Sequence, residues 1–329
     1  MADTGSRTVL PRRMLGRTGY EVSVLGIGGW LGLLDDPQAK RAFKEAEAVK
    51  AVRRAVDLGV NYFDTAPGYG NGEAERHLGL ALNALPQEER ARLYVSTKVG
   101  SHPERPQRYD VDAILWSVEQ SLGVLFADDV DIVYVHDPLT DEHMDQILGR
   151  GGALEALEHL KEQGVIGAIG LGIRTHRFLL RAIESDRFDV ILTSYDYTPI
   201  RASALPVIKQ AVARGVGVVN GSPYSAGLLA GLDPDVAAAR RTPLSMEDLE
   251  RARALWQWCQ KRGLDVGALA MQYSLRNELI SVTLAGPRTA QEVEANVRHA
   301  TATLPPGIWD ELSRFQKTLG PAPPGGGSE

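Results

Sequence analysis

Short apolar runs alternate with segments of helical periodicity along nearly the whole chain, and this alternation constrains the fold more than any other feature. Runs of about four to eight apolar and β-branched residues bounded by Gly or Pro predict buried strands. Eight such runs occur, near residues 23–28, 61–65, 93–98, 131–135, 166–171, 189–194, 216–220 and 280–285. Helical segments follow them, at 46–58, 73–84, 111–125, 151–163, 176–185, 202–214, 265–276 and 290–300. Eight strands that each precede a helix, without a break in composition, predict a (β/α)8 TIM barrel of the α/β class.

Two further predicted helices stand outside this repeat. One spans 247–262, after a long connection at 222–246 that contains several Gly and Pro residues, and the other spans 306–318. Long loops after barrel strands usually shape the substrate or cofactor pocket. We therefore expect a single barrel domain over 1–320. The Pro- and Gly-rich segment 321–329 is expected to be a disordered tail, because it cannot bury apolar surface.

Charge and composition exclude several classes of function. The 329 residues carry a formal net charge of −6 without a run of five Lys or Arg, so nucleic acid and anionic membrane surfaces are not expected partners. Cys259 is the only cysteine and the histidines lack metal-ligand spacing, so we expect neither a disulfide within the chain nor a bound metal. The start of the chain lacks a secretory signal and no stretch of 18 apolar residues occurs, which predicts a cytoplasmic protein.

Four polar side chains follow three of the predicted strands closely. Asp64 lies at the end of the second predicted strand and Tyr69 follows it, Lys98 ends the third, and His136 directly follows the fourth. In an α/β barrel the carboxyl ends of the strands form the catalytic rim, so these side chains should meet there. A carboxylate, a phenol, an ammonium and an imidazole in one place form a proton-transfer device. We expect the cation and the buried site to move the pKa of the Tyr69 phenol toward working pH.

Each of these side chains also has an ordinary structural explanation when it is taken alone. A Lys at a strand end is most often a solvated charge, and a Tyr in a Gly-rich turn most often packs its ring. His136 alone would more often be a structural histidine, and Asp64 could simply close a turn. The four residues together favour the catalytic interpretation over these separate ones.

A longer motif carries a resemblance to a known family. Residues 59–79, with the sequence GVNYFDTAPGYGNGEAERHLG, resemble the signature of the aldo-keto reductases, and Lys98 and His136 follow in that family's order. The resemblance implies a TIM barrel that binds extended NAD(P)H and moves a hydride between the nicotinamide and a carbonyl or alcohol. It also implies roles: Tyr69 as general acid and base, Lys98 depressing its pKa, Asp64 pairing with Lys98, and His136 orienting the substrate oxygen.

Three shorter motifs are similar to those of the sugar-oxidising branch, the aldose 1-dehydrogenases that act on fucose, threo-aldoses and plant galactose. They are VHDP at 135–138, DYT at 196–198, and NGSP at 220–223 with GLL at 227–229. In this branch the hydride leaves C1 of a cyclic sugar and a lactone results, so Tyr69 would take the proton of the C1 hydroxyl. Trp30 matches a position that lines the pocket, which implies a substrate site formed by Trp30, Tyr69 and His136. A packed core ring is the alternative for Trp30.

Two other functions remain open on the sequence. One is an aldehyde or ketone reductase with the same four residues, and the other is a non-catalytic barrel that binds NADP(H) as a sensor or channel-associated module. The complete set of Asp64, Tyr69, Lys98 and His136 argues against the second. The expected small-molecule partner is therefore a sugar or an aldehyde.

The cofactor site is also implied by resemblance, because residues 284–296 are similar to the family's phosphate and adenine segment. Gly286 allows close backbone approach, and the start of the following helix favours an anion. The expected cofactor contacts are Gly29, Asp64, Ser222, Pro223, Gly286, Arg288, Glu292 and Asn296. The sequence departs from the family where Gly172 and Ile173 replace the Ser-Asn pair that grips the carboxamide, and where Gly221 replaces a stacking aromatic ring. Tyr195 and Tyr224 are candidates for the missing contacts.

Glu292 decides the expected choice between NAD and NADP. It occupies the position at which NADP-specific relatives often place Arg, and a carboxylate there repels a 2′-phosphate while it can accept hydrogen bonds from the 2′-hydroxyl of NAD. Arg288, four residues earlier, favours NADP instead. We predict that NAD is preferred. The alternative is that Glu292 belongs only to the first turn of a helix, where acidic residues are favoured by the helix dipole.

Overall fold

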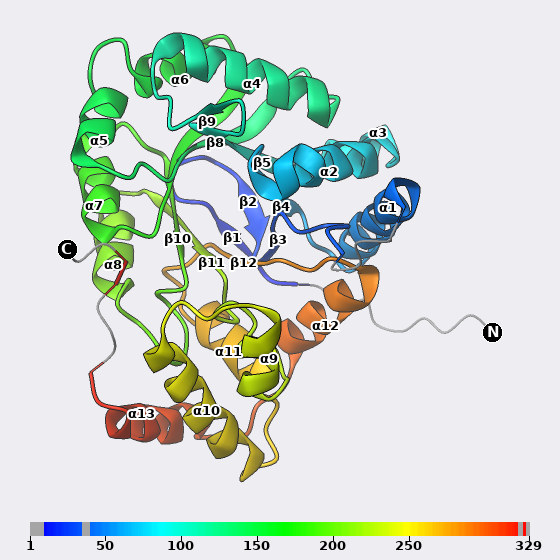
Figure 1. Cartoon of the computed structure of the whole chain (residues 1–329), viewed down its shortest axis with the longest axis vertical. Helices are drawn as coiled ribbons and strands as arrows, with labels where there is room; N and C mark the ends of the chain where they lie inside the picture. The colour runs from blue at the N-terminus through cyan, green and yellow to red at the C-terminus, as the bar shows by residue number, and fades with distance from the viewer. Residues whose placement is uncertain (1–9, 35–39, 322–324, 327–329) are drawn as a thin grey trace.

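Eight parallel strands close into a barrel at the centre of the protein (Figure 1). The structure is a computed structural model that describes residues 10–34, 40–321 and 325–326. The barrel strands are β3 (Leu25–Ile27), β4 (Tyr62–Asp64), β5 (Tyr94–Val99), β8 (Val130–His136), β9 (Ile166–Gly172), β10 (Val190–Ser194), β11 (Gly217–Gly221) and β12 (Val282–Ala285). Each strand pairs with its neighbours in chain order, and β12 pairs with β3 to complete the ring. The predicted TIM barrel is confirmed.

A layer of helices surrounds the barrel, and one predicted helix follows each strand (Figure 1). These are α1 (Arg41–Asp57), α2 (Glu73–Asn83), α4 (Val111–Leu125), α6 (Ala153–Glu162), α7 (His176–Ser185), α8 (Leu205–Ala213), α11 (Val266–Leu275) and α12 (Ala290–Thr301). The two additional predicted helices are α10 (Met246–Gln260) and α13 (Ile308–Thr318). Side-chain caps begin several of them: Asp110 accepts from the Ala113 N–H before α4, and Thr289 accepts from the Glu292 N–H before α12.

Several short elements were not predicted from the sequence. They are the hairpin β1 (Arg12–Met14) and β2 (Glu21–Ser23), the hairpin β6 (Ser101–His102) and β7 (Arg105–Pro106), the helices α3 (Gln87–Arg90), α5 (Asp141–Leu148) and α9 (Pro234–Arg240), and the 3-10 turn η1 (Tyr69–Gly72). A strand of two or three residues is too short to produce a period-2 pattern, so sequence periodicity does not reveal it. The helix α9 lies inside the predicted long connection after β11.

The interior of the barrel is filled with side chains and forms a packed core. Leu15 and Val22, from the β1–β2 hairpin region, join Tyr62, Tyr134 and other strand residues in one buried cluster. The hydroxyl groups of Tyr62 and Tyr134 lie 2.9 Å apart and satisfy each other in this apolar setting. Gly170 makes room for the Tyr134 ring, because a β-carbon there would lie 2.3 Å from a ring carbon. Chemistry is therefore confined to the rim of the barrel.

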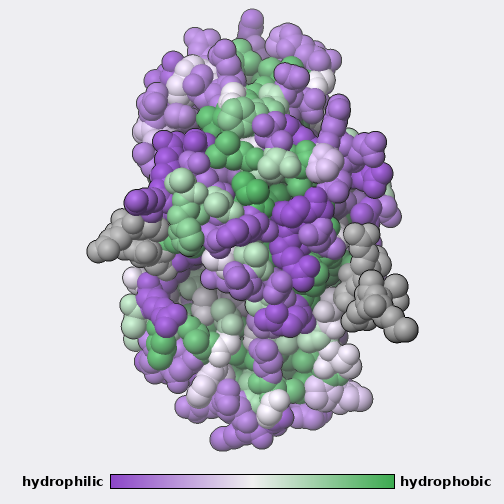
Figure 2. All heavy atoms as spheres, turned by 90° about the vertical axis from the view of Figure 1, so that its right-hand side faces the viewer, coloured by the Kyte–Doolittle hydropathy of each residue, from purple (hydrophilic) through white to green (hydrophobic). Residues whose placement is uncertain are grey.

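The surface on the side of α1, α2 and α12 shows hydrophilic side chains that alternate with smaller hydrophobic areas (Figure 2). No described helix is long and apolar enough to cross a membrane.

The expected tail is described only in part, because residues 322–324 and 327–329 lie outside the described residues. The Gly326 N–H donates to the Asp196 carboxylate at 3.0 Å, and its carbonyl accepts from the His176 N–H at 3.3 Å.

Candidate active site

The four residues expected to be catalytic lie together at the carboxyl-terminal rim of the barrel. Asp64 and His136 are the last residues of β4 and β8, Lys98 lies near the end of β5, and Tyr69 begins η1. The Lys98 Nζ atom is 4.8 Å from the centre of the Tyr69 ring. The Tyr69 and His136 rings are 5.9 Å apart, edge to face. Parallel pairing of β4, β5 and β8 produces this cluster, because it aligns their carboxyl ends.

Lys98 and Asp64 form a buried ion pair at the base of the cluster. The side chains are only 1% and 4% exposed, and Lys98 Nζ lies 2.6 Å from Asp64 Oδ2. Lys98 also donates to the Thr65 carbonyl at 2.7 Å, and the Ser96 hydroxyl donates to Asp64 Oδ1 at 2.7 Å. Burial lowers the pKa of Lys98, but the Asp64 carboxylate and Tyr69 outweigh it, so the net direction is upward. Lys98 is therefore held in its charged form beside Tyr69.

The pKa of Tyr69 corrects one expectation from the sequence. Burial raises the pKa of the phenol above its usual value, the positive charge of Lys98 lowers it, and burial is the larger effect. From the sequence we expected both the cation and the buried site to lower the pKa of Tyr69. The expectation for burial was wrong, because burial raises this pKa. Removing a phenolate from water disfavours the charged form, so burial acts in the opposite direction to the cation. Lys98 offsets part of that penalty.

His136 is neutral at this site. Burial lowers the pKa of its imidazole to about 3, and the neighbouring charge of Lys98 acts in the same direction. A neutral imidazole has one N–H donor and one lone-pair acceptor, so it can direct a hydrogen bond at a substrate oxygen. The cluster therefore combines a proton-exchanging phenol, a fixed cation and a neutral ring that can orient an oxygen.

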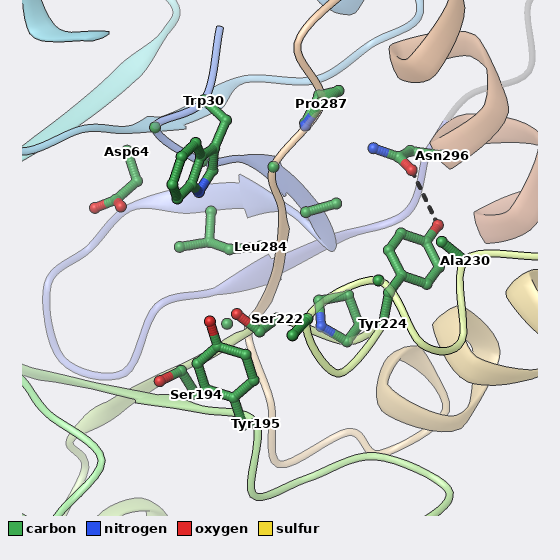
Figure 3. Close-up of a pocket in the computed structure, with 18 of the residues that line it drawn as sticks. Trp30, Asp64, Ser194, Tyr195, Ser222, Tyr224, Ala230, Leu284, Pro287 and Asn296 are labelled. Atoms are coloured by element: carbon green, nitrogen blue, oxygen red, sulfur yellow. Dashed lines mark hydrogen bonds between the residues drawn. The ribbon is translucent and has the colours of Figure 1, made fainter. Parts of the chain in front are cut away.

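A cavity of about 650 Å³ opens beside this cluster. Tyr69, His136 and Asp64 line it, whereas Lys98 lies behind them. All the residues expected to contact the cofactor line the same cavity: Gly29, Asp64, Ser222, Pro223, Gly286, Arg288, Glu292 and Asn296. In Figure 3, Asp64 lies at one end of the cavity and Asn296 lies at the other. The structure thus brings these residues together along one elongated site.

Trp30 is part of the cavity wall. Its ring is half-buried and lies nearly parallel to the Tyr69 ring, with the centres 6.3 Å apart. The Arg241 guanidinium lies 4.9 Å from the Trp30 ring centre, which covers the ring from another side. Ser194, Tyr195 and Ser222 lie across the cavity from Trp30 in the view of Figure 3. An aromatic surface facing hydroxyl groups is a suitable setting for a polar ring-shaped ligand.

The far end of the cavity is organised around Asn296. The Tyr224 hydroxyl donates to Asn296 Oδ1 at 3.0 Å and lies 2.8 Å from His299 Nδ1 (Figure 3). Of the two tyrosines considered for carboxamide contacts, Tyr224 therefore lies at the end opposite Asp64. Tyr195 lies beside Ser194 and Ser222.

The segment before α12 has the properties of an anion site. Gly286 lies close to Trp30, and a β-carbon at Gly286 would lie 2.6 Å from the indole ring. Arg288 lies two residues after Gly286 in the sequence. Arg240 and Arg241 also line the cavity. Glu292 accepts the Arg288 backbone N–H at 2.7 Å and stands in the first turn of α12. Glycines, arginines and the start of a helix lie together at this part of the cavity, and such groups can hold an anion.

Sequence reasoning missed several residues of this site. Ser101 lies 2.7 Å from His136 Nδ1, and Asp137 Oδ2 lies 3.3 Å from His136 Nε2. Asp137 has a left-handed backbone, with φ of 45°, which turns its side chain into the cavity. Asp137 could have been found as part of the VHDP motif. Ser101 and Arg241 carry no local signal, because only the folded chain brings them to the site.

The chain is similar to known proteins over most of its length. A model of the aldo/keto reductase family matches residues 24–317. L-galactose dehydrogenase from Arabidopsis thaliana is 34% identical over 319 residues, covering 95% of this chain and 96% of that protein. D-threo-aldose 1-dehydrogenase from a Pseudomonas species is 31% identical over 299 residues, covering 83% of this chain and 89% of that protein. In fold, an aldo-keto reductase from Bacillus halodurans matches 96% of this chain and 98% of that chain with a TM-score of 0.72 at 24% identity.

Proposed function

The chain belongs to the aldo/keto reductase family and is an oxidoreductase that uses a nicotinamide cofactor, and we propose that it oxidises a cyclic aldose at C1 to the lactone. The main support is the cluster of Tyr69, Lys98 and His136 beside a cavity that Trp30 also lines. The two relatives named for sugar dehydrogenation, at 34% and 31% identity, support the substrate class.

Each residue of the cluster would have a distinct role in the oxidation of the sugar. Tyr69 accepts the proton of the C1 hydroxyl, and Lys98 stabilises the phenolate that this step requires. His136 hydrogen-bonds the same oxygen and holds it toward Tyr69, while Asp64 keeps Lys98 charged and in place. A bound oxidised nicotinamide would supply the acceptor for the hydride that leaves C1. Trp30 covers one face of the sugar ring, which fits a ring that presents C–H groups on that face.

The cofactor would lie along the cavity from Asp64 to Asn296. Gly29 and Gly286 would permit close approach of the cofactor, the backbone before α12 and Arg288 would hold its phosphates, and Asn296 would bind its adenine. Asn296 suits this role because Tyr224 engages its Oδ1 atom, which leaves the amide NH2 as the group that can donate to a base. Ser222 and Pro223 complete the wall on the β11 side.

NAD is the preferred cofactor in this proposal. Glu292 lines the cavity, and its bond to the Arg288 N–H holds the carboxylate in place. A fixed carboxylate repels the 2′-phosphate of NADP and can accept hydrogen bonds from the 2′-hydroxyl of NAD. A cytoplasmic location is part of the same proposal.

A paired substrate panel tests the function. Free aldoses would be assayed with NAD+ and with NADP+, and aldehydes and ketones with the reduced cofactors, comparing kcat/KM and identifying lactones by mass spectrometry. We expect an aldose to give the highest kcat/KM and its lactone as product. Faster carbonyl reduction than sugar oxidation would favour the reductase alternative. Cofactor binding without turnover of any substrate would favour the sensor alternative.

A further inference from the structure

We infer that Ser101 is a positioning residue that, together with Asp137, holds His136 in the tautomer with its proton on Nε2. This N–H makes only a long contact of 3.3 Å with Asp137, so it can donate to the substrate oxygen when that oxygen is bound. The inference deepens the proposed function and rests on it for the identity of that oxygen. It concerns two residues that the sequence did not indicate as parts of the site.

The backbone delivers Ser101 to the histidine by a tight turn after β5. Gly100 has a φ of 87°, a left-handed conformation, and a β-carbon there would lie 2.3 Å from the Tyr109 ring. Only glycine fits both constraints without strain. The Tyr109 hydroxyl in turn donates to the His136 carbonyl at 2.9 Å, which fixes the histidine backbone. The turn at Gly100 and the Tyr109 bond therefore place Ser101 within hydrogen-bond distance of His136 Nδ1.

The two ring nitrogens of His136 have chemically different partners. Ser101 Oγ lies 2.7 Å from Nδ1, and a hydroxyl can either donate or accept. Asp137 Oδ2 lies 3.3 Å from Nε2, and an ionised carboxylate can only accept. The proton therefore belongs on Nε2, facing Asp137, and the Ser101 hydroxyl donates to the lone pair of Nδ1. The opposite tautomer would set the Nε2 lone pair against the carboxylate.

The titration behaviour of the ring agrees with this geometry. Burial and the charge of Lys98 lower the pKa of His136, so the ring is neutral and its single proton must choose one nitrogen. The choice matters for chemistry because an N–H donor stabilises an oxygen on which negative charge develops, whereas a lone pair repels it. Ser101 therefore acts on the reaction through His136 and has no need to touch the substrate.

Two measurements test the inference on the full-length protein. Nitrogen-15 NMR of histidine side chains reports which ring nitrogen carries the proton, and the His136 signal is identified by its loss in His136→Gln. In the wild type we expect Nε2 to be protonated. In Ser101→Ala only the 3.3 Å contact with the half-exposed Asp137 still favours a proton on Nε2. We therefore expect the second tautomer to appear and kcat to fall roughly 3- to 10-fold, the effect of one hydrogen bond.

Two further variants act as controls. Ser101→Thr keeps the hydroxyl and should restore both the single tautomer and kcat. Ser185→Ala removes a hydroxyl at the end of α7 that donates to the Ala182 carbonyl and accepts from the Arg187 N–H. Ser185 does not line the cavity, so this substitution should change neither quantity.

A wild-type ring protonated on Nδ1, or a Ser101→Ala ring that keeps one tautomer, would overturn the inference. The NMR result needs no substrate, so it stands even if sugars prove not to be oxidised. In that case kcat is compared on whichever substrate of the panel the wild type converts.

Discussion

The Nζ atom of Lys98 lies 2.6 Å from Asp64 Oδ2, and both side chains are almost completely shielded from water. Water cannot stabilise either charge there, so each depends on the other. The same ammonium lies 4.8 Å from the centre of the Tyr69 ring. The pair therefore connects the stability of the rim to the acidity of the phenol.

Replacing Lys98 by Met should affect both properties. Without the cation, burial acts unopposed on Tyr69, its pKa rises further, and the rate that remains should continue to climb at higher pH than in the wild type. Asp64 is left as an unpaired buried charge, which should cost about 3–5 kcal/mol of unfolding free energy. The double variant Lys98→Met with Asp64→Asn should recover stability without recovering activity. An unchanged pH–rate profile in Lys98→Met would contradict the coupling.

Replacing Tyr69 by Phe should remove the proton-transfer group while the ring still packs against Trp30 and His136. Turnover should fall by about 10²–10⁴-fold. Cofactor affinity, measured by fluorescence titration, should change by much less, because the hydroxyl serves chemistry more than binding. A variant that kept more than roughly a tenth of wild-type kcat would show that another group transfers the proton.

Replacing Glu292 by Arg should narrow or reverse the preference for NAD, measured as the ratio of kcat/KM for the two cofactors. The reason is that a cation attracts the 2′-phosphate that the carboxylate repels. Glu292→Gln separates the two roles of this residue, since the amide can still accept the Arg288 N–H but carries no charge. If the wild type prefers NADP, or if neither variant alters the ratio, the 2′ pocket is built from other residues.

Replacing Gly170 by Ala should destabilise the barrel, because the new methyl group would lie 2.3 Å from a carbon of the buried Tyr134 ring. Overpacking of this kind costs about 1–3 kcal/mol, which chemical denaturation can measure. Gly123→Ala is the matched control. Gly123 lies in α4 with open space around it, so the same substitution there should stabilise by roughly 0.5–1 kcal/mol. Equal effects at the two sites would refute the packing argument.

The low pKa of His136 predicts how stability depends on pH. The unfolded chain binds a proton on this ring near its usual pKa of 6.5, whereas the folded ring does so only at about 3. The unfolded state therefore binds more protons between these values, and folded-state stability should decrease as pH falls from 6.5 toward 3. The contribution is about 1.4 kcal/mol per pH unit. His136→Gln should remove that part of the slope, and wild-type and variant curves of the same slope would contradict the assignment.

The sequence by itself determined the barrel and the identity of the central residues. Eight apolar runs that alternate with helical segments leave a closed parallel barrel as the consistent solution, and Asp64, Lys98 and His136 could be placed at its rim because each ends or nearly ends a strand. These inferences need only local periodicity and the rule that parallel strands align their carboxyl ends.

Only the tertiary structure decided the electrostatics and the supporting contacts of the site. The net direction of the Tyr69 pKa depends on how completely the fold removes water, which no local pattern encodes. Ser101 meets His136 across 35 positions of sequence, through a hairpin too short to show periodicity. Arg241, which follows α9, likewise packs against the Trp30 ring from a distant part of the sequence. Such contacts arise from the closure of the barrel, which brings distant segments to one rim, and a linear sequence records them only as separate residues.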